Sequence, residues 1–197
     1  MNTRSRYSSD PFTDLLFNAL LGFTFLFLIA IMFMNPKAKS GIIDPKAEYM
    51  ITVSWPDNNP DDIDTWVEDP SGDIIWFRNP EAGLLHLDRD DRGTINDTLM
   101  INGIEIQNPL NQEVVTIRGV VTGEYIVNLH YYASETLQPV TATIKVAKVN
   151  PTLEIVYYGT VILDKKGDEK TAVRFTIGPD HQVKDINFVP KKLVILG

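Results

Sequence analysis

The sequence has no cysteine, only three histidines and only one long apolar run. The absence of cysteine excludes a lipid anchor on a cysteine and a cysteine nucleophile. His86, His130 and His181 lie in different segments, without the spacing of a metal site. Neither a Gly-x-Ser-x-Gly nucleophile motif nor a phosphate-binding loop is present. We therefore expect that the chain is not an enzyme and requires no cofactor.

Basic residues are outnumbered, with 18 Lys and Arg against 26 Asp and Glu, so the net charge is −8. This charge argues against nucleic acid, and against an anionic membrane surface, as partners of the soluble part. Internal repeats and low-complexity tracts are also absent. The length of 197 residues suffices for one domain and an anchor.

The long apolar run extends from Leu15 to Met34 and contains no charged residue. Only Asn18, Gly22 and Thr24 interrupt it. As a helix, the run reaches about 30 Å, which is the thickness of the hydrocarbon core of a bilayer. It therefore predicts a transmembrane helix.

A cleaved signal peptide is the alternative interpretation of this run, because Arg4 and Arg6 supply a basic start. The run is longer than the apolar region of a signal peptide, and residues 34–36 make a poor cleavage site. Pro36 instead fits the end of a helix, so we favour a retained anchor. Charge counting leaves its orientation open, because two lysines beyond the run balance the two arginines before it.

From Glu48 onward the chain consists of short runs rich in Val, Ile, Thr and aromatic residues, separated by turn signals such as residues 69–73. Polar and apolar residues alternate in several runs, for example from Tyr125 to Tyr131. Short strands without helical periods between them predict an all-β antiparallel sandwich or barrel. The ten predicted strands are Tyr49–Trp55, Ile63–Glu68, Ile74–Arg78, Leu84–Asp88, Glu113–Arg118, Glu124–Tyr132, Val140–Val149, Leu153–Leu163, Ala172–Ile177 and Val183–Phe188.

These patterns predict a single N-terminal transmembrane helix followed by an all-β antiparallel sandwich. We expect a tail over residues 1–14, the helix over 15–34, a linker over 35–47 and an extracytoplasmic β-domain over 48–197. Trp55, Trp66 and Trp76 lie in strand-like runs. We therefore favour packing in the core or at a sheet edge over a sugar-binding platform.

Asp14 is the candidate functional residue of the helix, because it lies at the edge of the apolar run. A carboxylate costs about 2.5–3.5 kcal/mol at the centre of a bilayer and less near the interface. The low dielectric disfavours its charged form, so such a group can exchange a proton or bind Na⁺. Asn18 and Gly22 share its helix face, Thr13 adjoins it, and Gly22 would allow close helix approach.

The alternative is that Asp14 only caps the N-terminus of the helix, where hydrogen bonding and the helix dipole favour aspartate. Asp10, followed by Pro11, could take the cap one turn earlier. The residues alone leave both roles open.

The run from Pro11 to Phe27, with its exit at Met34-Asn35-Pro36, resembles the single transmembrane segment of the ExbD/TolR/MotB family. That family has a short cytoplasmic tail, an aspartate one turn into an apolar helix, and an extracytoplasmic domain. The resemblance implies that Asp14 carries a translocated H⁺ or Na⁺ across the bacterial inner membrane, with the N-terminus in the cytoplasm. It also implies a homodimer inside a pentameric ring of multi-pass ExbB/MotA-like subunits.

The β-region is dense in acidic loop residues, notably over residues 57–64 and 88–91. Ca²⁺ takes six to eight oxygen ligands, so clustered carboxylates are candidates for its site. No EF-hand spacing is present, and the favoured alternative for most of these residues is turn formation on a solvated surface. The candidate calcium ligands are Asp62, Asp64, Asp88 and Asp90.

Residues 62–73 resemble the first signature block of the domain in YfaP-like bacterial proteins, and residues 83–91 and 123–132 resemble its next two blocks. This resemblance covers Tyr49 to Val149 and implies an extracytoplasmic β-sandwich without assigning an activity. The domain differs from the peptidoglycan-binding domain of MotB, so wall anchoring is not implied.

Two functions follow from these features. The leading hypothesis is an ion-carrying B-type subunit of a proton- or sodium-driven rotary motor, whose β-domain transmits force or binds an extracytoplasmic protein or envelope target. The alternative is a passive membrane anchor that displays a calcium- or ligand-binding β-sandwich, with Asp14 as a helix cap.

Overall fold

A computed structural model describes residues 11–34, 47–95 and 97–194. These residues form two compact units, a helix and a β-domain. Residues 1–10 of the predicted tail and residues 35–46 of the predicted linker lie outside the described residues.

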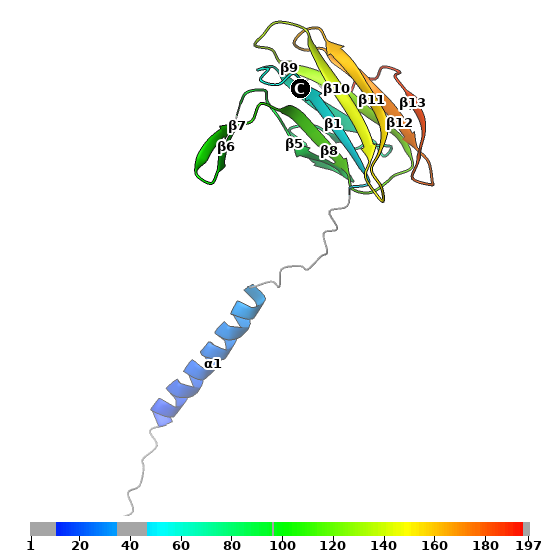
Figure 1. Cartoon of the computed structure of the whole chain (residues 1–197). Helices are drawn as coiled ribbons and strands as arrows, with labels where there is room; N and C mark the ends of the chain where they lie inside the picture. Colours follow the sequence, from blue (N-terminus) through cyan, green and yellow to red (C-terminus); the bar gives the residue numbers. More distant parts are fainter. Residues whose placement is uncertain (1–10, 35–46, 96, 195–197) are drawn as a thin grey trace, which may run out of the picture. The chain divides into compact units, whose positions relative to one another are not determined.

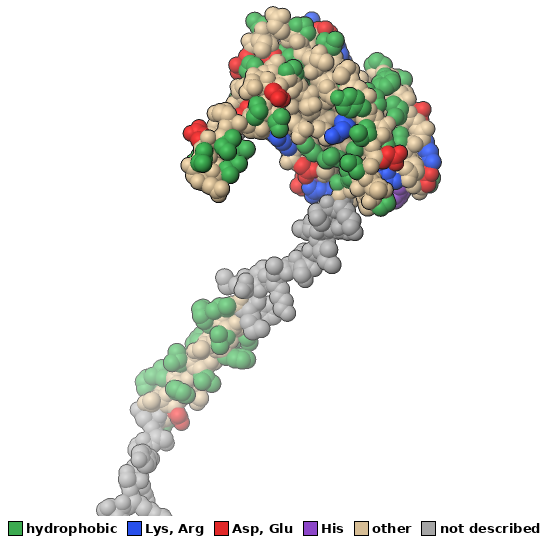
Figure 2. Space-filling model, viewed as in Figure 1, with side chains coloured by type: hydrophobic (Ala, Val, Ile, Leu, Met, Phe, Trp, Pro, Cys, Tyr) green, Lys and Arg blue, Asp and Glu red, His purple; other side chains and the backbone are tan. Residues whose placement is uncertain are grey.

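The helix α1 (Pro11–Met34) begins four residues before the predicted start and ends where predicted. Pro11 suits a first helical turn, because its fixed φ is helical and its missing N–H would have no partner there. Large apolar side chains are exposed along the helix (Figure 2), and none of its most apolar stretch is buried within the described chain. At about 36 Å, α1 is long and apolar enough to span a membrane.

The β-domain is an antiparallel sandwich, as predicted (Figure 1). One sheet has six strands in the order β11-β10-β1-β8-β5-β4, and the other has five in the order β13-β12-β9-β2-β3. The strands β6 and β7 form a separate hairpin. The bounds are β1 (Tyr49–Trp55), β2 (Asp62–Glu68), β3 (Ile74–Ile75), β4 (Glu81–Ala82), β5 (Leu85–Arg89), β6 (Thr98–Ile101), β7 (Ile104–Gln107), β8 (Asn111–Ile117), β9 (Gly123–Ala133), β10 (Val140–Lys148), β11 (Glu154–Leu163), β12 (Glu169–Ile177) and β13 (Val183–Asn187).

The core lies between the two sheets, because alternate residues of the central strands are apolar and face inward. Ile51 of β1 pairs with Val115 on one side and Val146 on the other, and all three are buried. Across the sandwich, the ring of Phe175 lies 6.3 Å from that of Tyr49 and stacks on Tyr125 at 5.4 Å. Aromatic packing therefore joins the two sheets.

The tryptophans pack as the sequence predicts. Trp55 and Trp66 are buried. Trp76 is half-buried and stacks on Trp66 with 4.5 Å between the ring centroids. Packing accounts for all three side chains.

The predicted strand Ile74–Arg78 is wrong beyond its second residue. Only Ile74–Ile75 forms β3, because Trp76 and Asn79 exchange two backbone hydrogen bonds, of 3.1 and 2.8 Å, around a turn. The short strand β4, which follows this turn, is also absent from the sequence prediction.

The hairpin β6–β7 was not predicted either, although its turn carries a strong signal. Asn102 and Gly103 both have positive φ, at 53° and 79°, as a tight type I′ turn requires. The pairs Leu99–Ile106 and Ile101–Ile104 lie on one face of the hairpin. These four side chains are exposed, so the hairpin, which projects from the sandwich (Figure 1), carries an apolar face.

The side chain of Glu169, which is only 4% exposed, holds the C-terminal segment against the second sheet. Glu169 accepts hydrogen bonds from the backbone N–H groups of Leu193 (2.6 Å) and Val194 (3.1 Å) and from Asn128 Nδ2 (2.6 Å). Burial alone raises the pKa of Glu169, but these donors and the nearby Lys192 ammonium lower it below its usual value. The charged carboxylate therefore stabilises this segment.

Acid is expected to release the C-terminal segment. Because the pKa of folded Glu169 lies below the unfolded value of about 4.3, its stabilisation is present above that pH and is lost as pH falls through the folded pKa. The amide protection factors of Leu193 and Val194 should drop about tenfold between pH 7 and pH 3. Glu169→Gln should show the lower protection already at pH 7. Equal protection in all three samples would refute this role.

Candidate functional site

Asp14 is the fourth residue of α1 and its only acidic residue. Since residues 11–13 are already helical, Asp14 lies within the first turn of α1 and not at its first described residue. Asn18 and Gly22 follow at intervals of four and lie on the same helix face. A Cβ added to Gly22 would meet no atom within 4 Å, so this part of the face is open to another helix. Thr13 adjoins Asp14 in the first turn.

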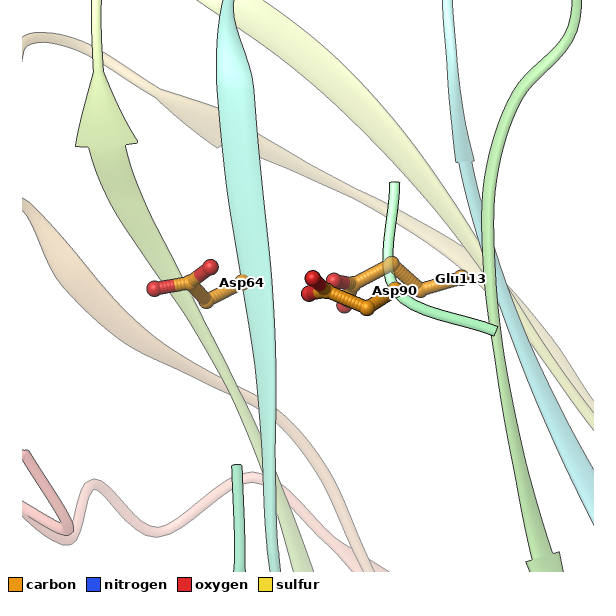
Figure 3. A group of neighbouring side chains, drawn as sticks. All are labelled: Asp64, Asp90 and Glu113. Carbon is orange, nitrogen blue, oxygen red and sulfur yellow. The ribbon is translucent and has the colours of Figure 1, made fainter. Parts of the chain in front are cut away.

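A second group of carboxylates lies in the β-domain. Asp64 projects from β2, Glu113 from β8 of the other sheet, and Asp90 from the loop after β5. Each offers a carboxylate oxygen, and these three oxygens lie within 4.8 Å of one another. In Figure 3, Asp90 and Glu113 extend toward β2, the strand that carries Asp64. We call these three residues the acidic centre.

The open edge of β2 explains how Glu113 enters the acidic centre. β2 pairs with β9 along its whole length on one side, but with β3 only at Val67 and Glu68 on the other. The N–H of Thr65 therefore lacks a strand partner, and it donates instead to Glu113 Oε2 at 2.6 Å. Glu113 occupies an inward position of β8, where the alternation of buried residues would otherwise place an apolar side chain.

Burial dominates the electrostatics of the acidic centre. It raises the pKa of Glu113 well above the usual value, and the nearby Asp64 and Asp90 carboxylates add to this effect. Burial likewise raises the pKa of Asp64, against the opposing effect of His130. The pKa of the neighbouring Asp62 rises to about 7, because burial and the charges of Asp64 and Asp90 all disfavour its ionised form.

Several charged and polar atoms near β2 have no hydrogen-bond partner among the described residues. They include Asp64 Oδ2, Glu113 Oε1 and Asp62 Oδ1, all buried. His130 Nδ1 lies 3.6 Å from Asp64 Oδ2, which is within the range of an ion pair but too long for a hydrogen bond. Buried carboxylate oxygens of this kind require a proton or a cation.

The loop that carries Asp90 is fixed from both sides. Arg89 forms an ion pair with the buried Asp91 at 2.7 Å, and Asp91 also accepts a 3.1 Å hydrogen bond from the N–H of Gln112. Gly93 has a φ of +65°, and a Cβ there would lie 2.5 Å from the carbonyl oxygen of Pro60. Only glycine permits this close approach, which holds the loop beside the start of β2.

The structure brings together two of the four predicted calcium ligands, Asp64 and Asp90, with Asp62 close by. The fourth, Asp88, lies elsewhere, because it pairs with Arg118 at 2.6 Å and accepts a hydrogen bond from Thr116. Glu113 was not predicted. The sequence does carry a signal for Glu113, because it is a charged residue at a position of the alternating strand β8 where an inward, apolar residue is expected.

Other acidic residues form turns, as the sequence favours. Asp69 accepts hydrogen bonds from the N–H groups of Ser71 (2.8 Å) and Asp73 (3.0 Å). His86 Nδ1 lies 3.6 Å from Glu81 Oε1, and His86 belongs to no cluster of metal-type side chains in the described part of the chain.

No protein-family model, curated protein or solved structure gives a significant match to this chain. The resemblances of the helix and of the β-domain therefore stay predictions. What the described residues establish is a helix able to span a membrane, a β-sandwich, and a cluster of three carboxylates within that sandwich.

Proposed function

We propose that this chain is the ion-carrying subunit of a proton- or sodium-driven membrane motor, in which Asp14 binds and releases the translocated ion. The observation that carries the proposal is the position of Asp14, a single carboxylate within an otherwise apolar helix. A carboxylate at membrane depth faces protein or water and not lipid, because lipid cannot solvate its charge. A protein partner in the membrane would provide such surroundings for Asp14.

The surface of α1 supports a partner of this kind. Its apolar side chains find no cover in the described chain. Asp14, Asn18 and Gly22 form a stripe of polar and small residues on one face, the type of surface through which membrane helices approach one another. We infer that two copies of α1 lie inside a ring of multi-pass subunits in the bacterial inner membrane, with the N-terminus in the cytoplasm and the β-domain outside.

In this arrangement the charge of Asp14 changes with each ion that passes. A protonated or Na⁺-bound carboxyl is neutral and tolerates apolar surroundings, whereas the free carboxylate favours a polar contact. Alternation between the two states changes how the helix fits its ring and drives rotation. The β-domain transmits the resulting force or binds a target outside the membrane.

The test is Asp14→Asn, measured as ion flux in cells that also make the multi-pass partner. We expect flux to fall to the level of cells without the chain, since an amide cannot ionise. Asp14→Glu should retain part of the flux. Asp10→Asn removes another carboxylate one turn away and should leave flux unchanged. Wild-type flux in Asp14→Asn would refute the proposal.

The acidic centre favours a second candidate, a membrane anchor whose β-domain binds a ligand through a cation. In that case Asp14 only interacts with the helix dipole. The two candidates differ in the Asp14→Asn experiment, because a passive anchor would keep its function with asparagine.

A further inference from the structure

We propose that Asp64, Asp90 and Glu113 form a Ca²⁺ site that joins the two sheets of the β-domain. This site does not depend on the role of Asp14, and it gives the β-domain of either candidate function a ligand. Glu113, which supplies the contact to the six-stranded sheet, has no place in the calcium site that the sequence predicts.

Burial is the first argument for a bound cation. Glu113 and Asp64 are only 1% and 2% exposed, and each has a buried oxygen without a hydrogen-bond partner in the described chain. Among the described residues, no lysine or arginine forms an ion pair with Asp64, Asp90 or Glu113. Asp64 has His130 Nδ1 at 3.6 Å, but three carboxylates this close together are stable only when protons or a cation neutralise their charge.

The ligand atoms select the kind of cation. All three groups offer only carboxylate oxygen, which suits hard cations such as Ca²⁺ and Mg²⁺ and not soft transition metals. Oxygens on opposite sides of Ca²⁺ lie about 4.6–5.2 Å apart, whereas those on opposite sides of Mg²⁺ lie about 4.0–4.2 Å apart. The three oxygens lie within 4.8 Å of one another, a limit that admits both ions. Ca²⁺ is the better candidate because it tolerates irregular sets of six to eight oxygens, whereas Mg²⁺ demands near-ideal octahedral geometry.

The surroundings would give the cation a route into the site. Asp90 is exposed and faces solvent, while the other two ligands are buried, so an ion would enter past Asp90. Bidentate carboxylates and water would supply the remaining oxygens that Ca²⁺ requires. Asp62, whose Oδ1 is buried without a partner, lies two residues before Asp64 on the same face of β2.

The positions of the ligands define the consequence of binding. β2 belongs to one sheet, β8 to the other, and Asp90 to the loop that Asp91 and Gly93 fix in place. One ion would link all three elements, at the point where β2 has β9 on one side and no strand partner on the other. Ca²⁺ should therefore stabilise the folded β-domain.

The experiment uses the full chain in detergent micelles, stripped with a chelator and then dialysed. Thermal unfolding of the β-domain is monitored by tryptophan fluorescence. With 1 mM CaCl₂ its melting temperature should rise by about 5 °C or more. MgCl₂ at the same concentration and ionic strength should raise it much less. Calorimetric titration with CaCl₂ should show one site per chain.

Three variants make the test specific. Asp90→Asn changes an exposed side chain and keeps the fold, and it should weaken Ca²⁺ binding at least tenfold. Glu113→Gln keeps an acceptor for the Thr65 N–H and should weaken binding further. Asp88→Asn, the matched control outside the acidic centre, should bind like the wild type. The proposal is overturned if wild-type protein neither binds Ca²⁺ nor gains stability, if Mg²⁺ acts equally, or if Asp90→Asn and Glu113→Gln both retain wild-type affinity.

Discussion

Replacing Asp61 with alanine is expected to lower the free energy of unfolding of the β-domain by about 3–5 kcal/mol. Asp61 is fully buried. Its Oδ1 accepts hydrogen bonds from the N–H groups of Glu135 (2.6 Å) and Thr136 (2.9 Å), and its Oδ2 accepts one from the hydroxyl of Tyr131 (2.7 Å). Alanine would leave the two N–H groups without this part-buried acceptor and would remove one of the partners of the Tyr131 hydroxyl.

The matched variant is Asp61→Asn, which should cost less. The amide oxygen can still accept from the two N–H groups, and Tyr131 has further partners in Ser134 and the carbonyl of Gln138. Urea unfolding of the full chain in detergent, followed by tryptophan fluorescence, measures both variants. If alanine and asparagine had equally small effects, the network around Asp61 would not stabilise the domain.

Phe175→Ala is expected to cost a similar amount, about 3–5 kcal/mol. Phe175 is fully buried and contacts Tyr49 of the opposite sheet as well as Tyr125 of its own. Removing the ring leaves a cavity between the sheets that close packing does not allow them to fill. The same urea titration measures the loss.

Phe188→Ala is the control for the loss of an aromatic ring at the surface. Phe188 is 56% exposed, so its truncation should change the free energy of unfolding by less than about 1 kcal/mol. A cost at Phe175 as small as that at Phe188 would mean that the contact between the sheets contributes little.

The sequence predicts the regular parts of this fold well. The strand Tyr49–Trp55 has the predicted bounds, because its alternation, aromatic ends and flanking breaks all agree. The turn at Asn102-Gly103 was missed because residues 98–107 follow a long acidic loop and contribute nothing buried to the sandwich. Hydrophobic pattern alone does not distinguish such a projecting hairpin from a loop.

The acidic centre could be predicted only in part from the sequence. Asp64 and Asp90 were singled out as dense acidic positions, but the partner Glu113 comes from the facing sheet, and only the packing of the two sheets brings it close. Asp88 was predicted as a ligand of the same site, but it lies outside the acidic centre. The pairing of β5 with β8 is irregular between Leu87 and Arg89, and the Asp88 carboxylate forms an ion pair with Arg118.

The helix is a different case, because its chemistry is local. A single carboxylate in an apolar run is visible in the sequence, and the structure adds that α1 begins early enough to place Asp14 inside the helix. What surrounds Asp14 in the membrane depends on other chains. The role of Asp14 is therefore tested by measuring ion flux and not by the fold of this chain.

Ion flux into proteoliposomes tests the central claim most directly. The chain is reconstituted with its multi-pass partner, a proton or sodium gradient is imposed, and uptake is followed with an ion-sensitive dye. The account predicts gradient-driven flux with wild-type protein and none above empty liposomes with Asp14→Asn, although the same complex still assembles. Equal flux with aspartate and asparagine at position 14 would contradict it.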